Sequence, residues 1–381
     1  MSIFENVYDI IITVALLIIM LLASMRINRL FGLGDRKGLY IFLWHTFFTI
    51  FYMYYTFHNT SDAMAYYSKS LDIQNYTSFA LGTKFVVYFT SLFSLHLKFS
   101  YLNCFLIYSF LGYIGLLAFA GSLNKAIVNQ SKVIKTIAWT IVFLPTVSFW
   151  TSAIGKDSIA FLASGLALWC ALNFRERILL FFTSIILMLL VRPHIAAILM
   201  LSFALSSVFD KKISILKRFF IGSIASGCMV VLIPLTLNYT GIGEVSDASD
   251  VEDYISQRQE SNLEGGSSVD IASMSFPMQI FTYLFRPLPF EAHSLFSLLA
   301  SFDNLILFLV LILGLKGMLN KNKPYVDSNR YFLWIFVFIS LVSLAITTAN
   351  LGIAMRQKWM FLPMFIFLLI SVAGNNIRVK L

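Results

Sequence analysis

Several cationic side chains stand directly at the ends of long apolar runs, and these are Lys156, Arg192, Arg286, Arg356 and Lys358. Burying a charge at membrane depth is costly, so such residues are candidates for function. A guanidinium group binds two phosphate oxygens at once, and a lysine ammonium adds a point charge. The five cations therefore predict a site for a multivalent anion such as a diphosphate.

Carboxylates and one histidine stand near the same ends. Asp62, Asp157, Glu291 and His194 are the candidates for a general base that deprotonates a sugar hydroxyl during glycosyl transfer. Tyr66 follows Asp62 in a tyrosine-containing stretch that suits sugar binding. Asp62 and Asp157 also suit a second role at helix N-termini, and His194 suits simple packing.

Several common enzyme motifs are absent from the sequence. It has no HExxH, DxD, P-loop or GxGxxG motif in a credible context, and its three cysteines show no metal-binding or CxxC spacing. This argues against a nucleotide-sugar enzyme and an ATP-driven pump, and we expect no metal and no cofactor. An active site at the outer face of the membrane has no nucleotide supply, so a membrane-lipid carrier is the natural activated donor, with the cations stabilising its diphosphate as a leaving group.

The elements that must position these residues are membrane spans. Of the 381 residues, 59% are hydrophobic and 12% are charged, a composition far from that of soluble domains. Apolar runs occur at 7–24, 39–57, 100–120, 133–150, 158–173, 178–190, 195–209, 219–237, 295–315, 331–348 and 361–374. The prediction is an all-α polytopic transmembrane bundle of about eleven spans that forms one domain over residues 1–381.

Basic residues alternate between rich and poor connections along the chain. They gather at 26–37, 125–135, 175–177, 211–218, 316–330 and 378–380. The positive-inside rule makes these segments cytoplasmic, which predicts an N-terminus outside and a C-terminus in the cytoplasm. The first run lacks a basic region before it and a cleavage pattern after it, so we expect a retained span.

Three further segments have predictions of their own. Residues 58–99 form an outer loop with an interfacial helix over 85–97, because a crossing there would reverse the later basic loops. Residues 178–209 are too long for one span, so the chain breaks at Val191-Arg192-Pro193-His194. Residues 238–291 form a large outer loop, flexible or a lid over 238–275, followed by an amphipathic or re-entrant element.

Short motifs in this layout resemble bacterial O-antigen or exopolysaccharide polymerases of the Wzy/EpsG-like type. The resemblance is carried by Asp62 with Tyr66, Ser148-Phe149-Trp150 with Gly155-Lys156-Asp157, Arg192-Pro193-His194, Phe285-Arg286-Pro287 and Arg356-Gln357. It implies block-wise joining of undecaprenyl-diphosphate-linked oligosaccharide repeat units at the periplasmic face, without a metal. Arg192, Arg286 and Arg356 would match the cations of the family that handle the diphosphate. Related polymerases often have two large outer loops, whereas this chain has one.

The expected partners are a lipid-linked oligosaccharide donor and acceptor, the lipid bilayer and a chain-length regulator protein, without nucleic acid. The expected location is the bacterial inner membrane. Three alternatives stay open: a GT-C-type lipid-phosphate-sugar glycosyltransferase, which Asp62 in the first outer loop would fit, a lipid-linked oligosaccharide flippase, and an O-antigen ligase. A flippase would show charges spread through the middle of its spans and related halves, whereas the charges here gather at one face.

Overall fold

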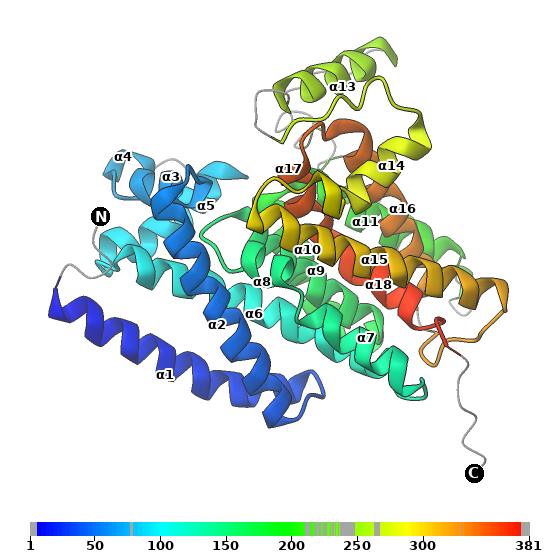
Figure 1. Cartoon of the computed structure of the whole chain (residues 1–381), viewed down its shortest axis with the longest axis horizontal. Coiled ribbons are helices and arrows are strands. Elements are labelled where there is room, and N and C mark those ends of the chain that lie inside the picture. Colours follow the sequence, from blue (N-terminus) through cyan, green and yellow to red (C-terminus); the bar gives the residue numbers. More distant parts are fainter. Residues whose placement is uncertain are drawn as a thin grey trace. The chain divides into compact units, whose positions relative to one another are not determined.

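The computed structural model is helical, as the apolar runs predict (Figure 1). It describes residues 6–374 without 77–78, 210–213, 237–247, 263–266, 328 and scattered positions between 217 and 235. No strand occurs among these described residues. About half of the predicted span 219–237 and all of the residues 378–380 lie outside them.

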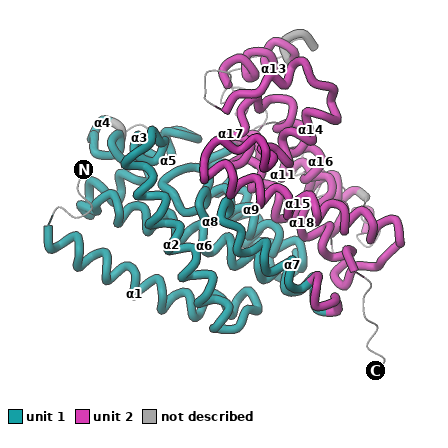
Figure 2. The backbone as a smooth tube through the Cα atoms, viewed as in Figure 1, with its two compact units in different colours: residues 1–128, 135–192 teal, residues 129–134, 193–381 magenta. Residues whose placement is uncertain are grey.

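The chain divides into two compact units (Figure 2). Unit 1 comprises residues 1–128 and 135–192, and unit 2 comprises residues 129–134 and 193–381. Unit 1 holds α1 (Val7–Leu30), α2 (Asp35–His58), α3 (Asp62–Ser70), α4 (Ile73–Tyr76), α5 (Thr83–Ser91), the π-helix η1 (Leu92–His96), α6 (Tyr101–Ala126), most of α7 (Lys132–Val142), α8 (Pro145–Thr151), α9 (Lys156–Ala171) and α10 (Phe174–Val191). Unit 2 holds α11 (Pro193–Phe209), α13 (Ala248–Asn262), α14 (Phe276–Phe285), η2 (Pro289–Glu291), α15 (Leu295–Leu319), α16 (Arg330–Thr347), α17 (Leu351–Gln357), η3 (Lys358–Met360) and α18 (Leu362–Ile370).

Several of these helices are long and apolar enough to cross a membrane, as in a multi-pass membrane protein. Within the described part of the chain they are α1, α6, the segment Lys132–Thr151, α15 and α16. A sixth candidate is the pair Leu351–Met360 and Leu362–Ile370, which is bent by 65°. Eleven spans and the orientation of the termini therefore stay predictions.

The predicted break after Val191 is confirmed. α10 ends at Val191, Arg192 has non-helical backbone angles, and Pro193 begins α11. Proline disfavours helical geometry in the residue before it and has no N–H to continue the ladder. Arg192 is therefore fixed at the end of a helix.

The predicted helix in the first outer loop forms, and a helix that was not predicted lies in the later polar segment. The segment 85–97 is helical as α5 followed by η1, and the nine residues of α5 reach only about 14 Å, too short to cross a membrane. The described part of 238–275 contains a helix, α13, whose Gln259 and Asn262 donate to the carbonyls of Ile346 and Thr347. These bonds tie α13 to the C-terminal end of α16, so this part of the predicted loop is ordered.

Close helix contacts through glycine build the centre of unit 1. α9 packs against both α6 and α10. A methyl group on Gly115 of α6 would lie 2.8 Å from Leu162 Cα, and one on Gly165 of α9 would collide with the Gly115 carbonyl. Small residues let helix backbones approach closely in membrane proteins, where burial from water supplies no driving force. This packing fixes the start of α9, where Asp157 lies.

Candidate functional site

Tyr66 is the meeting point of the residues that the sequence singled out in unit 1. Its half-buried phenol lies within electrostatic reach of the Asp62 and Asp157 carboxylates and the Arg192 guanidinium, and the side chain of Thr83 also interacts with it. These five residues come from α3, α5, α9 and the end of α10. Four of them were predicted as site residues, and Thr83 was not.

An ion pair joins two of these residues across a long sequence separation. Arg192 Nη2 donates to Asp157 Oδ1 at 3.1 Å, and the two side chains are only 16% and 18% exposed. Arg192 Nε is buried and has no acceptor among the described residues. A buried N–H without a partner costs free energy, and an anion bound at this guanidinium would remove that cost.

Local backbone features place each member of the cluster. Ser61 caps α3 by accepting from the Met64 N–H, which puts Asp62 in the first turn. Gly82, whose φ of +75° favours glycine, donates its N–H to the Leu190 carbonyl at 2.8 Å and joins the start of α5 to the end of α10. Asp157 lies in the first turn of α9, where the helix dipole stabilises a carboxylate.

The electrostatics of the cluster keep Tyr66 protonated. Burial, together with the negative charges of Asp62 and Asp157, raises the pKa of Tyr66 to about 12. A neutral phenol donates a hydrogen bond and does not act as a base at ordinary pH. Tyr66 is therefore suited to bind a substrate oxygen.

Three basic residues of unit 1 lie on tryptophan rings. Lys125 and Arg177 lie over the Trp169 ring, 4.3 and 4.0 Å from its centre, and Lys37 lies 4.1 Å from the centre of the Trp139 ring. Trp169 is twelve positions after Asp157 on α9, about 18 Å along the helix. On α9, Asp157 beside Arg192 is therefore far from Trp169, which carries Lys125 and Arg177.

Unit 2 contains a second arginine–carboxylate pair. Arg286 Nε donates to Glu291 Oε1 at 2.8 Å, and Arg286 Nη2 lies 2.7 Å from the same oxygen. Partial burial opposes ionisation of Glu291, but the bonds from Arg286 and from the Leu288 N–H outweigh it and hold the Glu291 pKa below its ordinary value. Glu291, a predicted base, is therefore a charged partner of Arg286.

Lys358, predicted to touch the substrate, is covered by protein and is 2% exposed. Its ammonium donates to the Leu284 carbonyl at 3.2 Å and to Asn304 Oδ1. Asn304 Nδ2 donates in turn to the Pro287 carbonyl at 3.1 Å. This placement corrects the expectation for Lys358, since in this arrangement its ammonium bonds to protein and not to a surface ligand. Asn304 has a role that the sequence did not reveal, although an Asp303-Asn304 pair inside an apolar run was a signal.

The remaining predicted residues are half-buried at element ends. Lys156 is the first residue of α9, His194 is the second residue of α11, and Arg356 lies in the last turn of α17. Asn350 caps α17 by accepting from the Ile353 N–H. Lys156 belongs to unit 1 with the Tyr66 cluster, whereas His194 and Arg356 belong to unit 2.

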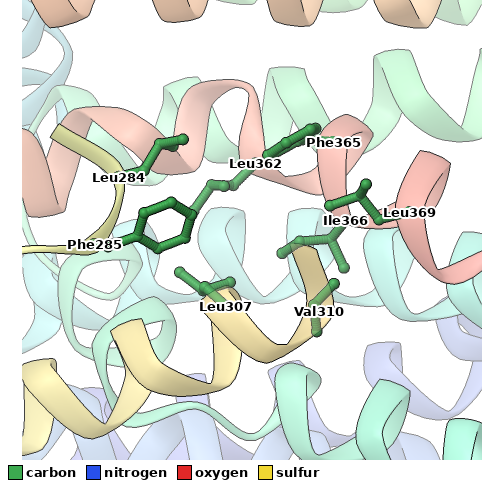
Figure 3. Close-up of a pocket in the computed structure, with 8 residues that line it drawn as sticks. All are labelled: Leu284, Phe285, Leu307, Val310, Leu362, Phe365, Ile366 and Leu369. Carbon is green, nitrogen blue, oxygen red and sulfur yellow. The ribbon is translucent and has the colours of Figure 1, made fainter. Parts of the chain in front are cut away.

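A small apolar cavity lies beside the Arg286 turn in unit 2. Leu284 and Phe285 face Leu307 and Val310 of α15 and residues of α18 across it (Figure 3). The remaining lining residues are Leu362, Phe365, Ile366 and Leu369. Its volume of about 10 Å³ leaves room for no more than about one water molecule. The cavity is part of the packing beneath the turn.

Comparison with known proteins finds no relative of this chain. No family model matches the chain, and neither a curated protein nor a solved structure is detectably similar to it. Among the described residues, no group of three His, Cys, Asp or Glu side chains could hold a metal ion.

Proposed function

We propose that this chain is a polysaccharide polymerase that joins undecaprenyl-diphosphate-linked oligosaccharide repeat units at the periplasmic face of a bacterial inner membrane. The observation that carries the proposal is the cluster of Asp62, Tyr66, Asp157 and Arg192 in unit 1. It combines a carboxylate that can act as a base, a guanidinium that can stabilise a diphosphate leaving group, and a neutral phenol that can bind a substrate oxygen.

The proposed reaction is one nucleophilic displacement at the anomeric carbon of the donor. A hydroxyl oxygen of the acceptor forms the new bond to this carbon while the bond from the carbon to the diphosphate oxygen breaks. The electron pair of the broken bond leaves with undecaprenyl diphosphate, and the hydroxyl proton passes to a carboxylate. Arg192 and Lys156 stabilise the charge that develops on the diphosphate.

Asp62 is the better base of the two carboxylates in unit 1. Asp157 is already bound to Arg192, so its role in this scheme is to orient the guanidinium. Asp62 is exposed in the first turn of α3, so an acceptor hydroxyl can reach its oxygens. Tyr66 would donate its hydrogen bond to a substrate oxygen between the two carboxylates.

The arginines of unit 2 suit a second phosphate-binding role. The acceptor of such a polymerase is itself linked to a lipid diphosphate, so the enzyme handles two anionic head groups. Arg286, which keeps a partly exposed guanidinium beside Glu291, and Arg356 supply further cations for them. Arg192, Arg286 and Arg356 are thus the proposed diphosphate ligands.

Deletion of the gene in its bacterial host, followed by gel separation of the surface glycan, tests the function. A polymerase predicts loss of long chains with single repeat units retained. Loss of the repeat units themselves would indicate the glycosyltransferase or flippase alternative. Full-length polymer that accumulates on its lipid carrier would indicate a ligase. Either of the last two results would overturn the proposal.

Asp62→Asn tests the base within this scheme. The substitution keeps the shape of the side chain and removes its ability to accept a proton, so long-chain glycan should fall by about 100-fold or more. Asp72→Asn is the matched control, because Asp72 is an exposed carboxylate in the same polar segment that accepts from the Gln74 N–H. Equal activity of the two variants would remove Asp62 from the mechanism.

A GT-C-type glycosyltransferase is the second candidate. The observation that favours it is the placement of Asp62 in the first turn of α3, shortly before the short helix α5. In that case the donor would be a lipid monophosphate sugar, and the deletion strain would lack complete repeat units. The gel experiment therefore separates the two candidates.

A further inference from the structure

The strongest unexplained feature of unit 2 is the buried ammonium of Lys358. Lysine is rarely fully buried, because its charge loses water and needs replacement partners. Lys358 finds them in the Leu284 carbonyl and Asn304 Oδ1, and Asp303 acts on it electrostatically. Replacing buried charges by apolar residues is often neutral or stabilising, so stability alone does not account for this lysine.

The partners of Lys358 lie on both sides of one residue. Leu284, whose carbonyl accepts from Lys358, stands two positions before Arg286, and Pro287, whose carbonyl accepts from Asn304, stands directly after it. Lys358 thus holds the backbone before Arg286 directly and the backbone after it through Asn304.

The remaining contacts of the turn complete the restraint on this arginine. Leu284 and Phe285 pack toward α15 and α18 (Figure 3), and Phe285 contacts Phe308 with ring centres 5.1 Å apart. Glu291 binds the guanidinium and also accepts from the Leu288 N–H at 2.8 Å. Backbone and side chain of Arg286 are therefore both set before any ligand arrives.

We propose that Lys358 is a positioning residue that acts through Asn304 and the Leu284–Pro287 turn to aim Arg286 at a diphosphate. The diphosphate part of this inference rests on the proposed function, and the positioning part does not. A preset guanidinium binds an anion with less loss of conformational freedom, so misplacing it weakens binding even when Arg286 itself is intact.

The positioning part is tested by the chemical reactivity of Arg286. The full chain in detergent is treated with p-hydroxyphenylglyoxal, and modification of Arg286 is measured by peptide mass spectrometry. Lys358→Met removes both bonds of the ammonium, and Asn304→Asp keeps an oxygen for Lys358 while removing the donor to Pro287. In each variant the reagent should modify Arg286 several-fold faster than it does in the unchanged chain.

Lys316→Met is the matched control, because Lys316 is an exposed lysine on α15. It should leave the modification rate of Arg286 unchanged. If Lys358→Met reduces the amount of inserted protein, Asn304→Asp decides the result alone. An unchanged Arg286 rate in Asn304→Asp, or an equal increase in Lys316→Met, would overturn the inference.

A double-mutant cycle tests the link to substrate. If Lys358 acts only through Arg286, Lys358→Met should reduce long-chain glycan when Arg286 is present. It should cause no further loss when it is added to Arg286→Ala. Additive losses would make Lys358 an independent contributor and contradict the inference. Faster Arg286 modification together with a surface glycan pattern that is not that of a polymerase would refute the proposed function and leave the positioning role standing.

Discussion

Each of the two units contains an arginine–carboxylate pair, and the two pairs are built in different ways. Arg192 and Asp157 are 35 residues apart and meet only because α9 and α10 pack together. Arg286 and Glu291 are five residues apart and meet within one turn, which Lys358 and Asn304 hold from two helices. The first pair therefore depends on helix packing, whereas the second depends on a polar anchor beneath a local turn.

The largest expected effect comes from removing the cations themselves. Arg192→Ala, Arg286→Ala and Arg356→Ala should each reduce long-chain glycan by about 100-fold or more, because each loses charge stabilisation on a diphosphate. Membrane insertion should be unchanged, as measured by the amount of protein in the membrane fraction. Normal glycan from all three variants would contradict the cation hypothesis.

A smaller effect should follow from disturbing the packing that supports only the first pair. Gly165→Ala places a methyl group against the Gly115 carbonyl and should destabilise unit 1 by about 1–3 kcal/mol. Thermal unfolding measures the loss, and modification of Arg192 should become faster while that of Arg286 does not change.

Gly34→Ala is the control for this packing prediction, because a methyl group there meets no atom within 4 Å. Equal acceleration at Arg192 and Arg286 in Gly165→Ala would show that the two pairs are not independently supported.

Tyr66→Phe sharpens the account of the first pair with a moderate effect. Losing one neutral hydrogen bond to substrate should reduce the rate of glycan extension by about tenfold. Burial and the two nearby carboxylates raise the pKa of Tyr66 to about 12, so the phenol stays protonated well above neutral pH. The pH profile between about pH 6 and 9 should therefore keep its shape in Tyr66→Phe. A lost titration step in that range would mean that Tyr66 exchanges a proton.

The smallest expected effect is the loss of the Arg286–Glu291 pair at low pH. The pKa of Glu291 is lowered in the folded chain, so the Arg286 pair is complete above the ordinary value of 4.5 and is lost as the pH falls through the lower folded value. The rate at which the reagent modifies Arg286, divided by its rate with free arginine at the same pH, should rise only when the pH falls below the folded pKa of Glu291. Glu291→Gln should remove this step, and a step that persists in Glu291→Gln would assign it to another carboxyl group.

Much of the first cluster was predictable from residue type and position. A proline after Arg192 sets the end of α10, and serine before Asp62 sets the start of α3. These are local rules of backbone geometry and capping, which do not depend on the rest of the fold. Residue type and position along the chain therefore suffice to select Asp62, Tyr66, Asp157 and Arg192 as candidates.

The role of Lys358 was not predictable in the same way. A lysine next to Trp359 at the edge of an apolar run is also typical of a membrane-interface anchor or a ligand for phosphate. Its bonds reach residues 54 and 74 positions away, and no local pattern encodes such distances. The ordered helix α13 within a polar segment is a similar case, because its bonds to the end of α16 are tertiary.

The sequence by itself determined that the chain is helical, that several helices are apolar enough to span a membrane, and that cations and acids gather at helix ends. Composition, hydrophobic run length and proline position suffice for this, because each acts within one segment. Only the tertiary structure decided which of these charges meet and which are covered. The pairing of Arg192 with Asp157 and the burial of Lys358 depend on how distant helices pack, and the packing of many side chains at once sets that geometry.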